Sequence, residues 1–214
     1  GEYDQRPQPG RDLQLGLDAD LQALGERLME GKLGAIVAIE PKTGQVLAMV
    51  SSPTFNPGMM IGKLRGKYQR DLTLDPAKPL LNRAIMGQYP PGSTFKTSQA
   101  VTYYTEGIIN DSTRYVCNHG FNFKGLHVGC HSHASPLALV PAISTSCNGY
   151  FCWGLYHMLS NRKKYKTLDD AMTVWRNYMV SMGFGYKLGI DLHGEKRGMI
   201  PNAQFYDHDF KTWN

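Results

Sequence analysis

Two short apolar runs joined by a turn constrain the fold of this chain more than any other feature. Residues 35–39 read Ala-Ile-Val-Ala-Ile, and residues 46–50 read Val-Leu-Ala-Met-Val. The connection Glu-Pro-Lys-Thr-Gly-Gln at residues 40–45 contains the residue types that turns prefer. Apolar runs of this length on either side of such a turn are typical of a β-hairpin in a buried sheet. We therefore expect both strands to lie in the centre of a sheet.

Two helical patterns flank the hairpin in the sequence, and the first helix is expected to pack with one face. Asp18 can cap a helix that ends near Gly31 and carries leucines at positions 17, 21, 24 and 28. Thr167 begins a capping box ahead of a second amphipathic helix, which Gly183 ends. These patterns place one amphipathic helix before the hairpin and another well after it.

Three stretches lack a regular pattern and are expected to be loops or linkers. Residues 1–15 are rich in Pro, Gly, Arg and Gln and are interpreted as an N-terminal arm or linker. Prolines at 53, 57, 76 and 79 predict a long irregular excursion over residues 51–82. Residues 185–201 alternate glycine with short apolar pieces. The domain is therefore assigned to residues 16–214.

A serine and a lysine three residues apart form the first candidate catalytic pair. Two prolines and Gly92 sharpen the entry to a helix that Ser93 is expected to open. Lys96 then lies one helical turn from Ser93, so the hydroxyl and the amine share a face. The lysine can act as a base near neutral pH only if its pKa falls by roughly three units from about 10.4, which is about 4 kcal/mol. The alternative is an N-cap serine followed by a solvated lysine.

A second polar constellation follows about fifty residues later. Ser146 and Asn148 flank Cys147 between two apolar segments. The hydroxyl could relay protons, and the amide could orient a peptide-like substrate. A helix N-cap is again the alternative.

With both motifs in view, the sequence resembles the transpeptidase domain of class B penicillin-binding proteins of the elongation type. These are acyl-serine transferases whose motif set includes Ser-x-x-Lys. The resemblance implies an α+β fold of the penicillin-binding-protein and β-lactamase-like type, in which an antiparallel sheet is flanked by helices. It extends over most of the chain, through residues 48–57, 82–84, 89–96, 183–185 and 189–192.

The resemblance also implies a reaction and a role for each motif residue. Ser93 would attack the D-Ala-D-Ala end of a peptidoglycan stem peptide, and β-lactams would acylate the same serine. Lys96 would activate Ser93, Ser146 would relay a proton, and Asn148 would contact the substrate amide. The backbone N–H of Ser93 would supply half of an oxyanion hole. The parent protein would be anchored in the inner membrane with this domain in the periplasm, and would work with a membrane-embedded glycan polymerase.

The chain departs from the family at the third motif, Lys-Thr-Gly. The family carries it on a strand after the other two motifs, whereas Lys42-Thr43-Gly44 precedes Ser93 and falls in the expected hairpin turn. We interpret it as a coincidence. The expectation is therefore that these residues are the N-terminal portion of the domain, with an incomplete sheet and impaired catalysis, because one oxyanion donor is worth about 2.7 to 4 kcal/mol.

Cysteine and histidine spacing predicts a structural zinc site beside the second motif. The pattern C-x12-C-x2-H-x13-C joins Cys117, Cys130, His133 and Cys147, and three cysteines with one histidine form a common closed zinc site. Elongation-type relatives resemble this, with a zinc near the active site held by acidic, His and Cys residues.

Several alternatives for these residues remain open. His127 or His131 could replace His133 as a ligand, and a Cys117–Cys130 disulfide could replace the metal. Cys152 lies between Phe151 and Trp153 and is interpreted as a core thiol.

Charge and apolar content exclude two kinds of interaction for these residues, nucleic-acid binding and a membrane span. The net charge is +5, and the one dense basic run, residues 162–166, is interpreted as a solvated loop, so no nucleic-acid partner is expected. No apolar stretch reaches the length of a membrane span. Alternative functions are a serine β-lactamase, a β-lactam sensor, or a zinc-stapled binding module without catalysis.

Overall fold

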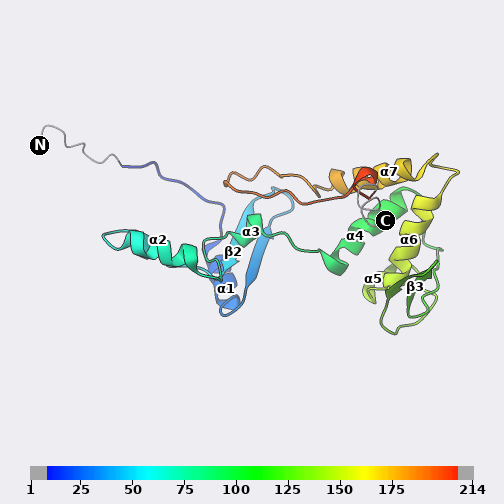
Figure 1. Cartoon of the computed structure of the whole chain (residues 1–214), viewed down its shortest axis with the longest axis horizontal. Helices are drawn as coiled ribbons and strands as arrows, with labels where there is room; N and C mark the ends of the chain where they lie inside the picture. The colour runs from blue at the N-terminus through cyan, green and yellow to red at the C-terminus, as the bar shows by residue number, and fades with distance from the viewer. Residues whose placement is uncertain (1–8, 207–214) are drawn as a thin grey trace, which may run out of the picture. The chain divides into compact units, whose positions relative to one another are not determined.

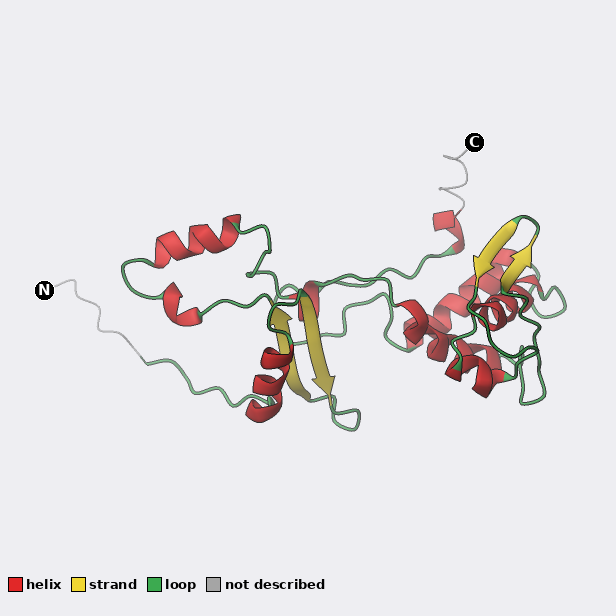
Figure 2. Cartoon of the chain, turned by 90° about the horizontal axis from the view of Figure 1, so that it is seen from below, coloured by secondary structure: helices red, strands yellow, loops and turns green. Residues whose placement is uncertain are grey.

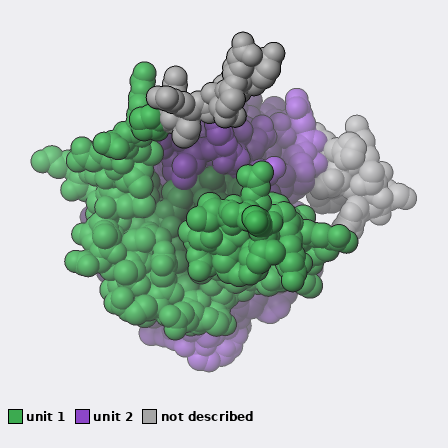
Figure 3. Space-filling view, turned by 90° about the vertical axis from the view of Figure 1, so that its left-hand side faces the viewer, with its two compact units in different colours: residues 1–87 green, residues 88–214 purple. Residues whose placement is uncertain are grey.

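The computed structural model describes residues 9–206 of the chain, and Figures 1 and 2 show its helices and strands. The chain divides into two compact units, Gly1–Gly87 and Gln88–Asn214, which are coloured separately in Figure 3. Residues 9–15 of the predicted arm contain no helix or strand, and residues 1–8 lie outside the described part. No helix within residues 9–206 combines the length and the apolar character needed to cross a membrane.

The first unit contains the predicted helix and hairpin. Helix α1 (Ala19–Leu28) begins after Asp18, whose side chain accepts a hydrogen bond from the Leu21 N–H at 2.9 Å. Strands β1 (Gly34–Ile39) and β2 (Val46–Ser52) pair antiparallel. Helix α1 packs on β2, and Gly25 permits the close approach, because a Cβ there would lie 2.8 Å from a methyl group of Val50. Both sequence predictions are confirmed.

The prediction that both strands are central is wrong for the described residues. There the sheet contains β1 and β2 only. Strand β1 exposes every second side chain, including Val37 at 43% and Ile39 at 54%. The apolar character of a run indicates burial, but it does not state how many strands flank it. Lys42-Thr43-Gly44 lies in the turn between the strands, as predicted.

The predicted irregular excursion over residues 51–82 is only partly irregular. It contains the 3₁₀ helix η1 (Pro57–Met60) and helix α2 (Arg65–Leu74), and α3 (Arg83–Met86) follows it. Residues 58–75 contain no proline, and the straight-chain residues of α2 are good helix formers. The prolines mark the borders of this helix and do not exclude it.

The second unit is mainly helical. It comprises η2 (Gly92–Thr94), α4 (Phe95–Thr105), β3 (Gly120–Phe123), β4 (Leu126–Gly129), α5 (Leu139–Ser144), α6 (Asn148–Ser160) and α7 (Leu168–Ser181). Strands β3 and β4 form an antiparallel hairpin. Thr167 and Asp170 form the predicted capping box of α7, and residues 185–201 contain no helix or strand, also as predicted.

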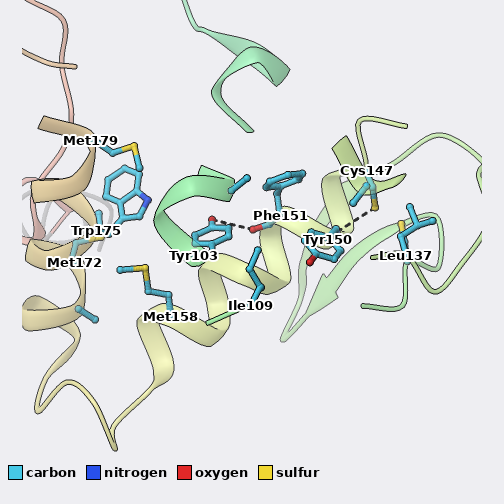
Figure 4. Packing of buried hydrophobic residues seen from close by; sticks show 14 of the residues in the cluster. Tyr103, Ile109, Leu137, Cys147, Tyr150, Phe151, Met158, Met172, Trp175 and Met179 are labelled. Atoms are coloured by element: carbon cyan, nitrogen blue, oxygen red, sulfur yellow. Dashed lines mark hydrogen bonds between the residues drawn. The ribbon is translucent and has the colours of Figure 1, made fainter. Parts of the chain in front are cut away.

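The core of this unit forms where α6 packs against α4 and α7. Its fully buried side chains include Tyr103, Tyr150, Met158 and Met179 (Figure 4). Gly154 allows α4 and α6 to approach, because a Cβ there would lie 2.6 Å from the Tyr103 ring. The two sequence motifs lie at the N-terminal ends of α4 and α6, so this packing fixes the motifs relative to each other.

Candidate active site

The amine of Lys96 lies at the centre of a hydrogen-bonded cluster. It donates to the Ser93 Oγ at 3.2 Å, the Ser146 Oγ at 2.9 Å and the Asn148 Oδ1 at 2.6 Å. The Ser146 hydroxyl donates to the Ser93 Oγ at 2.9 Å. The four residues predicted from the two motifs therefore share one site, although about fifty positions separate the motifs.

Local backbone geometry places these groups. Ser93 lies in η2, immediately before α4, so it precedes the helix that it was expected to open. Ser146 has a φ of 51° in the turn between α5 and α6. Cys147 is the N-cap of α6 and accepts from the Tyr150 N–H at 3.3 Å through its sulfur. The second motif therefore does lie at a helix N-cap, as the alternative stated, but the capping residue is Cys147, and Ser146 and Asn148 remain available to Lys96.

Burial shifts the protonation equilibrium of Lys96 toward the neutral amine. Burial lowers the pKa of Lys96 below its ordinary value of 10.5, and the nearby Cys130, Cys147 and Cys152 oppose that effect. A neutral amine in contact with two hydroxyls can accept a proton from either. Ser93 itself is exposed, so an external molecule can reach its hydroxyl.

Two backbone carbonyls also belong to the site, and sequence reasoning did not find them. The carbonyl oxygen of Ser146 accepts from the Lys96 amine at 2.6 Å. The Gly129 carbonyl accepts from the Asn148 Nδ2 at 2.8 Å, so both ends of this amide are engaged within the chain. Every residue carries a carbonyl, and no sequence pattern marks these two.

The four predicted metal ligands form one cluster beside this site. The ligand atoms of Cys117, Cys130, His133 and Cys147 all lie within 4.8 Å of one another. They come from the segment before β3, the segment after β4 and the N-cap of α6. The four cysteines of the chain are free thiols, so the structure does not contain the alternative Cys117–Cys130 disulfide.

The two histidines that were considered as alternative ligands, His127 and His131, lie outside the cluster. The His127 Nδ1 is 2.5 Å from the Asn122 Oδ1. His131 packs edge-on against the His133 ring, with 5.6 Å between the ring centroids. Cys152, which is half-buried, is also not a member.

The donor set fits a tetrahedral zinc ion. Zinc–sulfur bonds of about 2.3 Å place neighbouring ligand atoms roughly 3.8 Å apart, which the cluster reaches with small adjustments. Burial would raise the pKa of Cys130, but N–H donation from Asn148 and Gly149 and the His133 contact lower it to about 6. Burial raises the pKa of Cys147 to about 12, so this thiol needs a cation beside it to ionise at neutral pH.

Comparisons with known proteins agree with this geometry. Residues 34–212 match the family model of the penicillin-binding protein transpeptidase domain. The chain is 36% identical over 208 residues to the peptidoglycan D,D-transpeptidase MrdA of Acinetobacter baumannii, covering 93% of the chain and 28% of the relative. The chain thus spans less than a third of that relative's length.

Solved structures are similar over nearly the same range. Pseudomonas aeruginosa PBP2 in complex with WCK 5153 has a TM-score of 0.76 and 28% identity, over 95% of this chain and 44% of that one. A peptidoglycan synthase complex that coordinates polymerization and crosslinking has a TM-score of 0.70 and 29% identity, over 89% of this chain and 32% of that one. The chain therefore belongs to the penicillin-binding protein transpeptidase domain family, whose α+β fold it shares.

Proposed function

We propose that this chain supplies the serine nucleophile of a peptidoglycan D,D-transpeptidase, which cross-links the cell wall through an acyl-serine intermediate. One observation carries the proposal. The Lys96 amine touches both the Ser93 and the Ser146 hydroxyl, and these two hydroxyls touch each other. An activated serine with a proton relay is the arrangement that acyl transfer requires.

Each residue has a defined step in this reaction. Ser93 Oγ attacks the carbonyl of the penultimate D-alanine in a stem peptide while Lys96 accepts its proton. The proton then passes from Lys96 through Ser146 to the departing amine of the terminal D-alanine, which leaves an ester on Ser93 and a neutral Lys96. The amine of a second stem peptide attacks the ester and loses a proton to Lys96, and the released Ser93 oxygen takes this proton back, which restores the hydroxyl. The backbone N–H of Ser93 would donate to the oxyanion, and a β-lactam would form the same ester.

We propose that the cluster beside the site holds a structural zinc ion through Cys117, Cys130, His133 and Cys147. Bound zinc would cross-link three segments of the second unit. Cys147 lies between Ser146 and Asn148, and the Asn148 N–H donates to the Cys130 sulfur at 3.3 Å. The metal would therefore fix the relay hydroxyl and the amide that contact Lys96, without taking part in the acyl transfer.

The setting of the whole protein is proposed from its family. The domain would lie in the periplasm, attached to the inner membrane, where stem peptides are available. A glycan polymerase of the elongation machinery would be its partner. The similarity to a synthase complex that coordinates polymerization and crosslinking supports this pairing.

Covalent labelling by a fluorescent penicillin tests the acyl-transfer proposal on the whole protein. We expect a stable label that Ser93→Ala abolishes. Ser98→Ala, on the adjoining helix α4, is the matched control and should label normally. Rapid release of hydrolysed penicillin would instead indicate a β-lactamase. A folded, zinc-loaded protein that never labels would indicate a binding module and would refute the proposal.

A further inference from the structure

A groove on the second unit lies outside the site described above. It consists of two connected hollows of about 400 and 520 Å³, which share Tyr115 and His157 as lining residues. The first hollow is bounded mainly by residues 114–122 and Trp153. The second is bounded by residues 107–108 and by residues 160–163, of which Arg162 and Lys163 belong to the basic run noted in the sequence. The reaction proposed for Ser93 uses none of these residues.

Aromatic rings form a continuous ladder along this groove. The Tyr115 and His157 rings stack at 5.3 Å with an interplanar angle of 14°, and His157 stacks on Trp153 at 5.9 Å and 29°. His157 is exposed, and the other two rings are partly exposed. Burial lowers the pKa of His157, so its imidazole is neutral at neutral pH and can both donate and accept a hydrogen bond.

Cations line the groove, and no acidic side chain is among its described lining residues. Arg114, Arg162 and Lys163 line the hollows and are exposed. The acidic side chains closest in sequence are engaged elsewhere. Glu106 pairs with Lys164 and accepts from the Tyr178 hydroxyl, and Asp111 accepts from Tyr104. The groove is therefore complementary to a ligand that carries carboxylates.

The groove begins on the helix that carries the second motif. Trp153 and His157 lie five and nine residues after Asn148 on α6. At a rise of 1.5 Å per residue, His157 is about 13 Å along the helix axis from the start of α6. The groove and Asn148 of the candidate active site are therefore carried by the same helix.

We propose that this groove binds the glycan backbone of a peptidoglycan strand. Sugar rings would pack their C–H groups against the aromatic ladder. Asn118 and Asn122 line the first hollow and would bond sugar hydroxyls. The carboxylates of the attached stem peptides would meet Arg114 and Lys163. This inference rests on the proposed function, because it takes the same polymer as the substrate.

The chemistry of the lining favours a glycan strand over a membrane surface. A layer of anionic headgroups would be bound by the cations alone, whereas these cations border hollows that aromatic rings also line. A short acidic peptide would use the cations but would leave the ladder without a partner. A chain of sugars with acidic branches uses both features.

The test measures binding of soluble, uncrosslinked peptidoglycan strands to the whole protein by calorimetry. The strands are used with their stem peptides and after the peptides have been removed. Lys163→Glu should weaken binding of peptide-bearing strands about tenfold, the usual size for a lost charge-assisted hydrogen bond. It should change binding of stripped strands by less than twofold. His157→Ala should weaken both about tenfold. Lys67→Glu, an equal charge change at an exposed position of α2, should change neither.

Penicillin labelling of Ser93 separates this proposal from the proposed function. Both groove variants should label at the normal rate, which also shows that they are folded. A conservative His157→Phe variant should retain binding of stripped strands within threefold. Unchanged strand affinity in both Lys163→Glu and His157→Ala would overturn the proposal. The proposal would also be overturned if the groove substitutions weakened binding of anionic vesicles or of a single-stranded oligonucleotide but left binding of peptidoglycan strands unchanged. If these substitutions weakened strand binding in a protein that penicillin never labels, only the acyl-transfer proposal would be refuted.

Discussion

The lysine cluster and the thiol cluster of the second unit share one turn of backbone but differ in their exposure. Ser146 and Asn148 face Lys96, whereas Cys147 between them faces the other three metal-type ligands. Ser93 of the first cluster is exposed, while Cys117 and Cys147 of the second are buried. The exposed cluster can react with an external molecule, and the buried one can hold that geometry. We therefore expect substitutions in the first cluster to reduce mainly the acylation rate and substitutions in the second to reduce mainly the metal content.

Removal of the central amine should have the largest effect on reactivity. Lys96→Met keeps the aliphatic stem but leaves Ser93 without a base. We expect penicillin acylation to fall by about 10² to 10⁴, the range typical of a lost general base. Zinc content and the melting temperature should change little. Lys67→Met on α2 is the matched control, and a Lys96→Met protein that labels at the normal rate would contradict the role of the amine.

Removal of a buried ligand should have a smaller effect on reactivity and a larger one on metal content. Cys117→Ser replaces an ionisable thiol by a hydroxyl that does not ionise at neutral pH. We expect stoichiometric zinc to be lost, measured by elemental analysis, and acylation to fall about 10- to 100-fold, as when a group that orients a site is removed. Full acylation by a zinc-free variant would show that the two clusters are independent.

Sequence reasoning found the side chains of both clusters because they follow recognisable patterns, Ser-x-x-Lys in the first cluster and C-x12-C-x2-H-x13-C in the second. It also found α1, the hairpin and the α7 cap, where a local signal such as Asp18 or Thr167 fixes the boundary. It missed α2, because the prolines around that segment were given more weight than the helix formers within it.

Long-range features of the site were beyond prediction from the sequence. Contacts to the Ser146 and Gly129 carbonyls depend on backbone placement. The pairing of α4 with α6 brings Lys96 to residues fifty positions later, and it rests on packing of side chains such as Tyr103 and Phe151. The Ser-x-Asn motif predicted the presence of polar groups but not the left-handed turn at Ser146 that directs them.

The pH dependence of acylation should distinguish the exposed cluster from the buried one. Burial lowers the pKa of Lys96, and only its neutral form can accept a proton from Ser93. The neutral fraction grows as pH rises, so the acylation rate should rise with pH, by at most about tenfold per unit. The inflection should lie below the ordinary lysine value of 10.5. A rate measured by stopped-flow labelling that falls with pH, while circular dichroism remains constant, would contradict this assignment.

The smallest expected effect comes from the cysteine that belongs to neither cluster. Cys152 follows Phe151 on α6 and is half-buried, and its thiol is not among the four grouped ligand atoms. Cys152→Ser should therefore retain one zinc per chain. It should acylate within about twofold of the normal rate, because serine has nearly the shape of cysteine and the substitution removes none of the hydrogen bonds of Lys96. It serves as the matched control for Cys117→Ser. If Cys152→Ser lost its zinc while His133→Ala retained it, Cys152 and not His133 would be the fourth ligand. The metal would then lie closer to the Lys96 side of α6.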